Sequence, residues 1–269
     1  MDIAKLIETE KKLSEYKGED EVLSSWELRD LLKEQNKDKK EVILFSGIPS
    51  LDSLIQGFQG GELNVFSGLT ANGKTLLAQT LTKNFDEHGE KSLWFTYEVR
   101  PSQFFYQFDS LPLFYLPKVL KDNNLNWLYY RVWEAKIKYG IKAVFIDHLH
   151  FLVDMKRHNI SLEIGAVMRS LKKIALHFNL VFFLIAHTQK IRLETEPDNN
   201  DLRDSSFVAQ EADNVFFVWR VPDKENQPKN QSVLKISKNR RYGIMNKKIK
   251  LIKVGKYLQE LTEELKNGL

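Results

Sequence analysis

The sequence contains no cysteine, and no apolar stretch approaches the roughly 18 residues from which a membrane-spanning helix is built. Without cysteine, the chain can hold no disulfide framework, no catalytic thiol and no Cys-ligated zinc. Asp2 follows Met1 where a secretory signal would carry a basic segment and then an apolar one. We therefore expect a cytoplasmic protein that makes no membrane contact.

Net charge is also small, but the charges are unevenly distributed. The 40 basic and 36 acidic residues leave a net charge of +4, yet residues 226–259 hold ten basic residues and no acidic one. A stretch of one sign suits a polyanion such as phosphate or nucleic acid, although a solvated pair of strands also explains it. Hydrophobic residues make up 42% of the 269 residues, enough for the core of one large domain with a short appendage.

The pattern of residues divides the chain into two parts. Residues 1–40 are polar and helical in pattern, with a capping box at Ser24-Ser25-Trp26-Glu27, and predict a helical arm or linker. Residues 41–269 predict an α/β domain with a mostly parallel sheet covered by helices, because β-type runs alternate with helical periods. The expected helices are Lys74–Asp86, Trp127–Tyr139 and Ser161–His177. The expected strands are Leu63–Phe66, Ser92–Thr96, Ala143–Ile146, Val181–Ala186, Val215–Trp219, Val233–Ile236 and Lys248–Ile252, the last two forming an antiparallel extension.

The strongest motif is a phosphate-binding loop. Residues 68–75, Gly-Leu-Thr-Ala-Asn-Gly-Lys-Thr, fit the pattern G-x-x-x-x-G-K-[ST] and lie between an expected strand and an expected helix. The glycines let backbone N–H groups surround a phosphate, Lys74 supplies a cation, and the Thr75 hydroxyl suits Mg²⁺. This context predicts a nucleotide triphosphate site.

Further polar residues end other expected strands. Asp147 ends one strand and suits a metal ligand, Glu98 follows another and suits the orientation of a water, and His187 follows a third. Chemistry gathers at the carboxyl ends of strands in open α/β sheets, so we expect these side chains to lie near the loop. The alternatives are an ordinary turn aspartate, a glutamate that opens a helix before Pro101, and a structural histidine.

From about Phe45 to Ile252, the chain resembles the RecA-like ATPase domain of DnaB-type hexameric replicative helicases. The resemblance lies in the order and spacing of several short motifs around the phosphate loop. These motifs are Ser46–Leu54 with Gly57 and Gly60–Leu63, Phe95–Glu98, Phe145–Leu152, Leu184–His187, Asp201–Ser205 with Gln210–Asp213, and Lys238-Asn239-Arg240.

The resemblance implies a RecA-like P-loop core, an α/β fold with a mostly parallel twisted sheet flanked by helices and a short N-terminal helical arm. It implies ATP and Mg²⁺ as cofactors, bound between subunits of a ring, with Thr75 and Asp147 holding the metal. Lys74, Glu98 and His187 would act on the triphosphate, and Lys238 and Arg240 would reach in from the neighbouring subunit, with Arg241 as a competing finger. The nucleotide contacts would come from Gly68, Thr70, Ala71, Asn72, Gly73, Lys74, Thr75 and Leu76.

Single-stranded DNA is the expected partner of such a ring. The candidate contacts are Lys190, Arg192, Arg203, Asp204 and Ser205, with residues 156–161 as a second candidate loop. Each of these charges also fits a mobile surface residue. The aromatic stretch from Phe104 to Trp133 suits an interface or a platform for stacked bases, and ordinary packing is the alternative.

The expected function is thus an ATP-hydrolysing enzyme, a DNA helicase or single-strand translocase of the DnaB type. It would act as a homo-oligomer, expected to be a hexamer, alongside other replication proteins. The family's separate N-terminal helical domain and a primase domain are missing from the sequence, and residues 26–32 occupy the position of the linker helix. Two alternatives remain: a recombination or regulatory ATPase of the RecA superfamily that does not unwind, and an ATP-switched loading or assembly partner.

Overall fold

The computed structural model describes residues 3–35, 41–153, 159–188, 196–198, 201–202, 206–221 and 230–263. Two compact units are distinguished, Met1–Glu41 and Val42–Leu269. Among the helices of the described ranges, none combines the length and the apolar character needed to cross a membrane.

The first unit contains two helices, α1 (Ile3–Ser14) and α2 (Ser25–Gln35). The predicted capping box begins α2: Glu27 N donates to Ser24 Oγ at 3.2 Å, and Ser24 N donates to Glu27 Oε2 at 2.9 Å. These reciprocal bonds satisfy two amides that a helix N-terminus leaves unpaired. The start of α2 is therefore encoded locally, as the sequence predicted.

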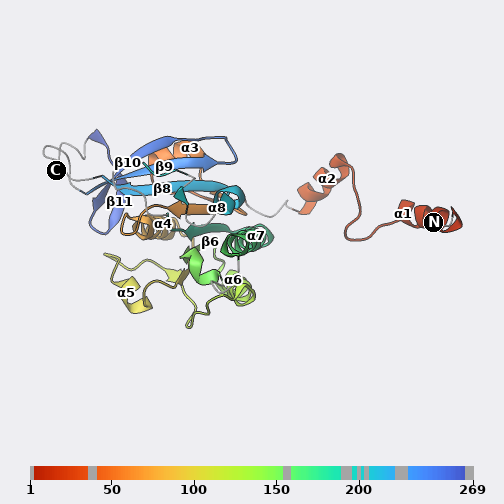
Figure 1. Ribbon diagram of the computed structural model, residues 1–269, viewed down its shortest axis with the longest axis horizontal. Coiled ribbons are helices and arrows are strands. Elements are labelled where there is room, and N and C mark those ends of the chain that lie inside the picture. Colours follow the sequence, from red (N-terminus) through yellow and green to blue (C-terminus); the bar gives the residue numbers. More distant parts are fainter. Residues whose placement is uncertain are drawn as a thin grey trace. The chain divides into compact units, whose positions relative to one another are not determined.

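The second unit is organised around a sheet of nine strands in the order β11-β10-β9-β8-β3-β7-β6-β4-β5 (Figure 1). Strands β8, β3, β7, β6, β4 and β5 run parallel, and β8 to β11 are antiparallel neighbours. The strands are β3 (Leu63–Ser67), β4 (Ser92–Thr96), β5 (Phe114–Tyr115), β6 (Ala143–Asp147), β7 (Val181–Ile185), β8 (Asn214–Arg220), β9 (Gln231–Asn239), β10 (Lys247–Val254) and β11 (Tyr257–Glu260). A separate pair is formed by β1 (Ile43–Leu44) and β2 (Phe58–Gln59). The predicted α/β class, the parallel sheet and the antiparallel extension are confirmed.

Helices cover both faces of the sheet. One face packs against α6 (Leu125–Tyr139), α7 (Ile160–Phe178) and α8 (Ser206–Glu211), and the other packs against α3 (Pro49–Ile55), α4 (Lys74–Glu87) and α5 (Pro101–Phe105). A 3₁₀ turn, η1 (Leu149–Leu152), follows β6. The central strands β3, β4, β6 and β7 are buried along their whole length, which is why they read as continuous apolar runs in the sequence.

Phenylalanine rings form the centre of the α4 face. Phe183 stacks on Phe145 with ring centroids 4.6 Å apart, and Phe58 meets it edge-on at 4.8 Å. Phe66 and Phe85 complete the contact at 5.6 and 5.8 Å. This packing fixes β3, β6 and β7 against α4, and so holds the loop before α4 next to the ends of the other strands.

The rings of the aromatic stretch divide between the core and the surface. Phe104 and Phe108 are buried, and Phe104 packs on Trp94 at 4.7 Å. Tyr130 and Trp133 on α6 are exposed. Ordinary packing therefore explains Phe104 and Phe108, whereas Phe105 and Tyr106 between them are exposed, as are the two rings of α6.

Candidate active site

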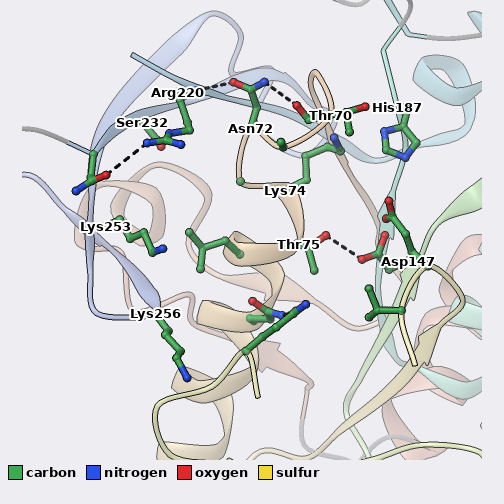
Figure 2. A pocket seen from close by; sticks show the side chains of 18 residues that line it. Thr70, Asn72, Lys74, Thr75, Asp147, His187, Arg220, Ser232, Lys253 and Lys256 are labelled. Atoms are coloured by element: carbon green, nitrogen blue, oxygen red, sulfur yellow. Dashed lines mark hydrogen bonds between the residues drawn. The ribbon is translucent and has the colours of Figure 1, made fainter. Parts of the chain in front are cut away.

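A pocket of about 760 Å³ opens at the carboxyl edge of the parallel strands (Figure 2). It holds most of the residues that the sequence placed at the site, together with several from the antiparallel extension. Its lining consists of Thr70, Ala71, Asn72, Gly73, Lys74, Thr75, Leu76, Gln79, Glu98, Val99, Gln107, Asp147, His187, Arg220, Asn230, Ser232, Lys253 and Lys256. All the predicted nucleotide contacts except Gly68 line this pocket.

Gly68 is required for the backbone conformation at the start of the loop. Its φ is +145°, and a Cβ at this position would lie 2.2 Å from the Val218 carbonyl oxygen of β8. A side chain would therefore push the start of the loop away from the sheet. Gly73, with φ +96°, begins α4 in a left-handed conformation that also favours glycine.

Lys74 lies beneath the loop. Its Nζ donates to the carbonyl oxygens of Gly68 at 3.0 Å and Leu69 at 2.9 Å, and the residue is only 5% exposed. Burial lowers the pKa of Lys74 to about 8, while the carboxylates of Asp147 and Glu98 act in the opposite direction. The ammonium group is held among backbone oxygens beside the pocket, where a phosphate would complete its hydrogen bonds.

Thr75 and Asp147 meet as the sequence predicted, with Thr75 Oγ1 donating to Asp147 Oδ2 at 2.9 Å. Asp147 is 2% exposed, and its Oδ1 has no hydrogen-bond partner within the described part of the chain. Burial raises the pKa of Asp147 to about 7, against the opposing hydrogen bond from Thr75. A hydroxyl beside a carboxylate with an open oxygen is a donor set that suits Mg²⁺.

Glu98 follows β4 by two residues, and its carboxyl group lies beside that of Asp147, where it helps to raise the pKa of Asp147. Its side chain is 43% exposed, and its Oε2 lies 3.8 Å from Nδ1 of His148. His187 follows β7, and its ring centroid lies 4.5 Å from that of His148. Glu98, Asp147 and His187 therefore share one pocket, because the parallel strands that precede them end at the same edge.

Lys238 and Arg240 do not line this pocket. The register pairs Lys238 with Val215 and Asn239 with Asn214, at the beginning of β8, whereas the phosphate loop follows the end of the parallel neighbour β3. The two basic residues therefore lie at the opposite edge of the sheet.

Both basic residues are held by their own chain. Lys238 Nζ donates to the carbonyl oxygens of Ala209 at 2.6 Å and Ala212 at 2.8 Å, at the end of α8. Arg240 donates through Nη1 to Asp213 Oδ1 at 3.1 Å and through Nη2 to the Gln210 oxygen at 2.8 Å.

Arg241, the competing finger candidate, is more enclosed. Its Nη2 donates to the carbonyl oxygens of Ile55 and Gly57, and its side chain is 18% exposed, against 50% for Arg240. Of the two arginines, Arg240 therefore has the more exposed side chain.

Sequence reasoning missed the wall of the pocket formed by Arg220, Asn230, Ser232, Lys253 and Lys256. Figure 2 shows Lys253 and Lys256 across from Asp147 and His187. Of these residues, only Lys253 and Lys256 are among the ten basic residues of the stretch 226–259, and the sequence pattern did not show which face of the sheet their charges occupy. The five predicted DNA contacts, Lys190, Arg192, Arg203, Asp204 and Ser205, lie outside the described residues.

The two shifted pKa values predict a narrow optimum for binding of Mg²⁺ and ATP. Below about pH 7, Asp147 must lose a proton before it can hold a cation, and above about pH 8, Lys74 loses its charge. We expect the affinity to be greatest between these values and to fall by up to about tenfold per pH unit on either side. Calorimetric titration from pH 5.5 to 9.5 measures this profile. Asp147→Asn is the control, because it should remove the acidic limb and leave the alkaline one; a flat wild-type profile would contradict the prediction.

Comparison with known proteins agrees with the geometry. Residues 117–259 match the family model of the DnaB-like helicase C terminal domain. A probable replicative DNA helicase of Trieres chinensis is 28% identical, over 86% of this chain and 61% of that protein. The replicative DNA helicase DnaB of Mycoplasma pneumoniae is also 28% identical, over 68% of this chain and 48% of that protein. The chain thus spans about half to three fifths of the length of these relatives.

Solved structures show the same fold. A DnaB-like replicative helicase, studied with its interactions with primase, superposes with a TM-score of 0.75 at 20% identity, over 96% of this chain and 71% of that one. An isolated ATPase domain superposes with a TM-score of 0.75 at 20% identity, over 89% of this chain and 99% of that one. These likenesses confirm the predicted fold, in which helices flank a large and mostly parallel sheet.

Proposed function

The chain belongs to the family of the DnaB-like helicase C-terminal domain, and from this premise we propose that it is an ATP-driven DNA helicase or single-strand translocase. Residues 41–269 would form the ATPase domain and residues 1–40 an arm or linker. The curated relatives that it matches are named replicative DNA helicases. The observation that carries the proposal is the contact between Thr75 and Asp147 in the pocket that also holds Lys74 and Glu98.

Each residue of the pocket has a role that its position supports. The loop N–H groups and Lys74 would bind the phosphates, and Thr75 with Asp147 would hold Mg²⁺, which neutralises phosphate charge when bound. Glu98 would orient the attacking water, since its half-exposed carboxylate lines the same pocket as the loop. His187 would donate a hydrogen bond to the terminal phosphate and respond to its loss.

Lys238 and Arg240 would act on the site of a neighbouring chain. Their position at the far edge of the sheet supports a ring, proposed to be a hexamer, in which each triphosphate lies between two subunits. A guanidinium supplied in this way stabilises the charge of the transition state. Other replication proteins are proposed as further partners; the neighbour studied with primase is one example within the fold.

The decisive experiment compares ATP turnover with and without single-stranded DNA, followed by unwinding of a forked duplex. We expect DNA to raise turnover at least about tenfold and unwinding to require ATP. Stimulation without unwinding would favour the alternative of a RecA-type recombination or regulatory ATPase. Absence of turnover, with ATP binding retained, would favour an ATP-switched assembly partner and contradict the motor.

A further inference from the structure

Three metal-binding side chains meet at the ends of β4, β6 and β7. Each of Glu98, His148 and His187 offers a ligand atom, and these atoms all lie within 4.8 Å of one another. Glu98 Oε2 and His148 Nδ1 are 3.8 Å apart, and the rings of His148 and His187 meet at 76° with centroids 4.5 Å apart. The two rings are partly buried, while Glu98 is exposed.

We propose that Glu98, His148 and His187 form a binding site for a late first-row transition metal ion, with Zn²⁺ as the representative ligand. Two imidazoles and one carboxylate are a donor set that Zn²⁺, Co²⁺ and Ni²⁺ prefer, whereas Mg²⁺ prefers oxygen ligands and retained waters. Three protein ligands leave a fourth tetrahedral position for water.

The geometry requires only a small adjustment. Bonds of about 2.0–2.1 Å in a tetrahedral site bring the ligand atoms to about 3.4 Å from one another. Rotation of the half-exposed Glu98 side chain can shorten its distance of 3.8 Å to His148 Nδ1. His148 and His187 follow two adjacent buried strands that are paired residue by residue, Asp147 with Ile185, so their backbones are held in place.

This site is distinct from the Mg²⁺ position proposed between Thr75 and Asp147. That position offers a hydroxyl and a carboxylate, and the transition-metal site offers two imidazoles and the opposing carboxylate. His150 lies beside the group, with its ring 5.5 Å from that of His148 and 6.5 Å from that of His187, and is not one of the three ligands.

The site has a consequence that rests on the proposed function. Glu98 and His187 are the residues to which we assign the orientation of water and contact with the terminal phosphate. An ion that coordinates both removes them from the reaction, and excess Mg²⁺ does not compete for imidazole nitrogen. Micromolar Zn²⁺ is therefore expected to inhibit turnover in the presence of millimolar Mg²⁺, while nucleotide binding persists.

Metal binding is tested on the full chain without nucleotide, after removal of adventitious metal. Titration with Co²⁺ should produce one saturable visible absorption band per chain, which Zn²⁺ abolishes and excess Mg²⁺ leaves intact. His148→Ala and His187→Ala should each weaken Co²⁺ binding by about tenfold or more, since even outer-shell changes cost about 10–100-fold. His88→Ala is the matched control, because His88 ends α4 away from the site and should change nothing.

X-ray absorption of the Zn²⁺-loaded wild-type protein gives a readout that does not depend on the folding of any variant. Scattering from two imidazole rings and from oxygen would support the site. A shell of oxygen atoms alone would overturn it, and so would a Co²⁺ absorption band that is unchanged in His148→Ala and His187→Ala. Because binding is measured without turnover, a protein that binds Co²⁺ as described but hydrolyses no ATP would retain this site and lose the proposed function. If ATP turnover is unchanged when Zn²⁺ saturates the site, the predicted inhibition is wrong.

Discussion

Replacing Arg240 with alanine should lower ATP turnover by about three orders of magnitude, because a guanidinium supplied to a transferring phosphate is worth about 10³–10⁵ in rate. Binding of ATP should change little, since Arg240 lies at the edge of the sheet opposite the chain's own pocket. The measurement is steady-state turnover with single-stranded DNA at saturating ATP. Lys250→Ala is the matched control, because it removes an exposed base from the same basic stretch.

A mixing experiment separates action on a neighbour from action within one chain. Lys74→Ala lacks the cation of its own pocket but retains Arg240, and Arg240→Ala retains an intact pocket. Each variant alone should be inactive. In a mixed ring, about a quarter of the interfaces join an intact pocket to an intact arginine, so mixing should restore measurable turnover. Mixtures that stay as inactive as their components, although the chains exchange, would contradict the placement of Arg240.

Glu98→Gln should lower turnover by about 10²–10⁴-fold, the usual contribution of a positioned base. The amide retains the shape of the side chain but loses the charge that polarises a water. ATP affinity should stay within a few-fold of wild type, because Lys74, Thr75 and Asp147 remain in place. Single-turnover hydrolysis together with equilibrium binding separates these two effects.

Glu87→Gln is the control for Glu98→Gln. Glu87 is exposed at the end of α4, where it pairs with Lys83 at 2.6 Å, and its charge does not face the pocket. It should leave turnover unchanged. If Glu98→Gln hydrolyses ATP at the wild-type rate, the water must be oriented by another group, and the assignment of Glu98 is wrong.

The features that the sequence predicted correctly are those with a short-range cause. The phosphate loop is a contiguous run, and the capping box of α2 needs four neighbouring residues. The central strands are apolar along their length because both of their faces are covered. Glu98, Asp147 and His187 come together by one rule, since parallel strands end at a common edge.

The features that the sequence did not reveal depend on register and tertiary contact. The basic wall of the pocket exists because β9 and β10 pair in one register, which brings Ser232 opposite Leu251. A shift of one residue would place the other face of these strands in the pocket. Strands β1, β2 and β5 have only two residues each. They are too short to show the alternation of apolar and polar residues by which a strand is predicted. In the sequence analysis, His148 was included only within the motif Phe145–Leu152 and was given no role. The structure places it beside Glu98.

In the proposed ring, Arg240 must leave its intrachain bonds to Asp213 and Gln210 before it can reach a neighbouring site. Leaving Asp213 would not strand a buried charge, because Lys172 Nζ still binds Asp213 Oδ2 at 2.6 Å and Leu63 N donates to the same oxygen at 2.8 Å. The exchange would therefore replace charge-assisted bonds within the chain by charge-assisted bonds to a phosphate. Intrachain binding then acts as a competitor whose occupancy reduces the fraction of arginine available to a neighbour. The rate of each site would be set by that population as much as by the chemistry in the pocket.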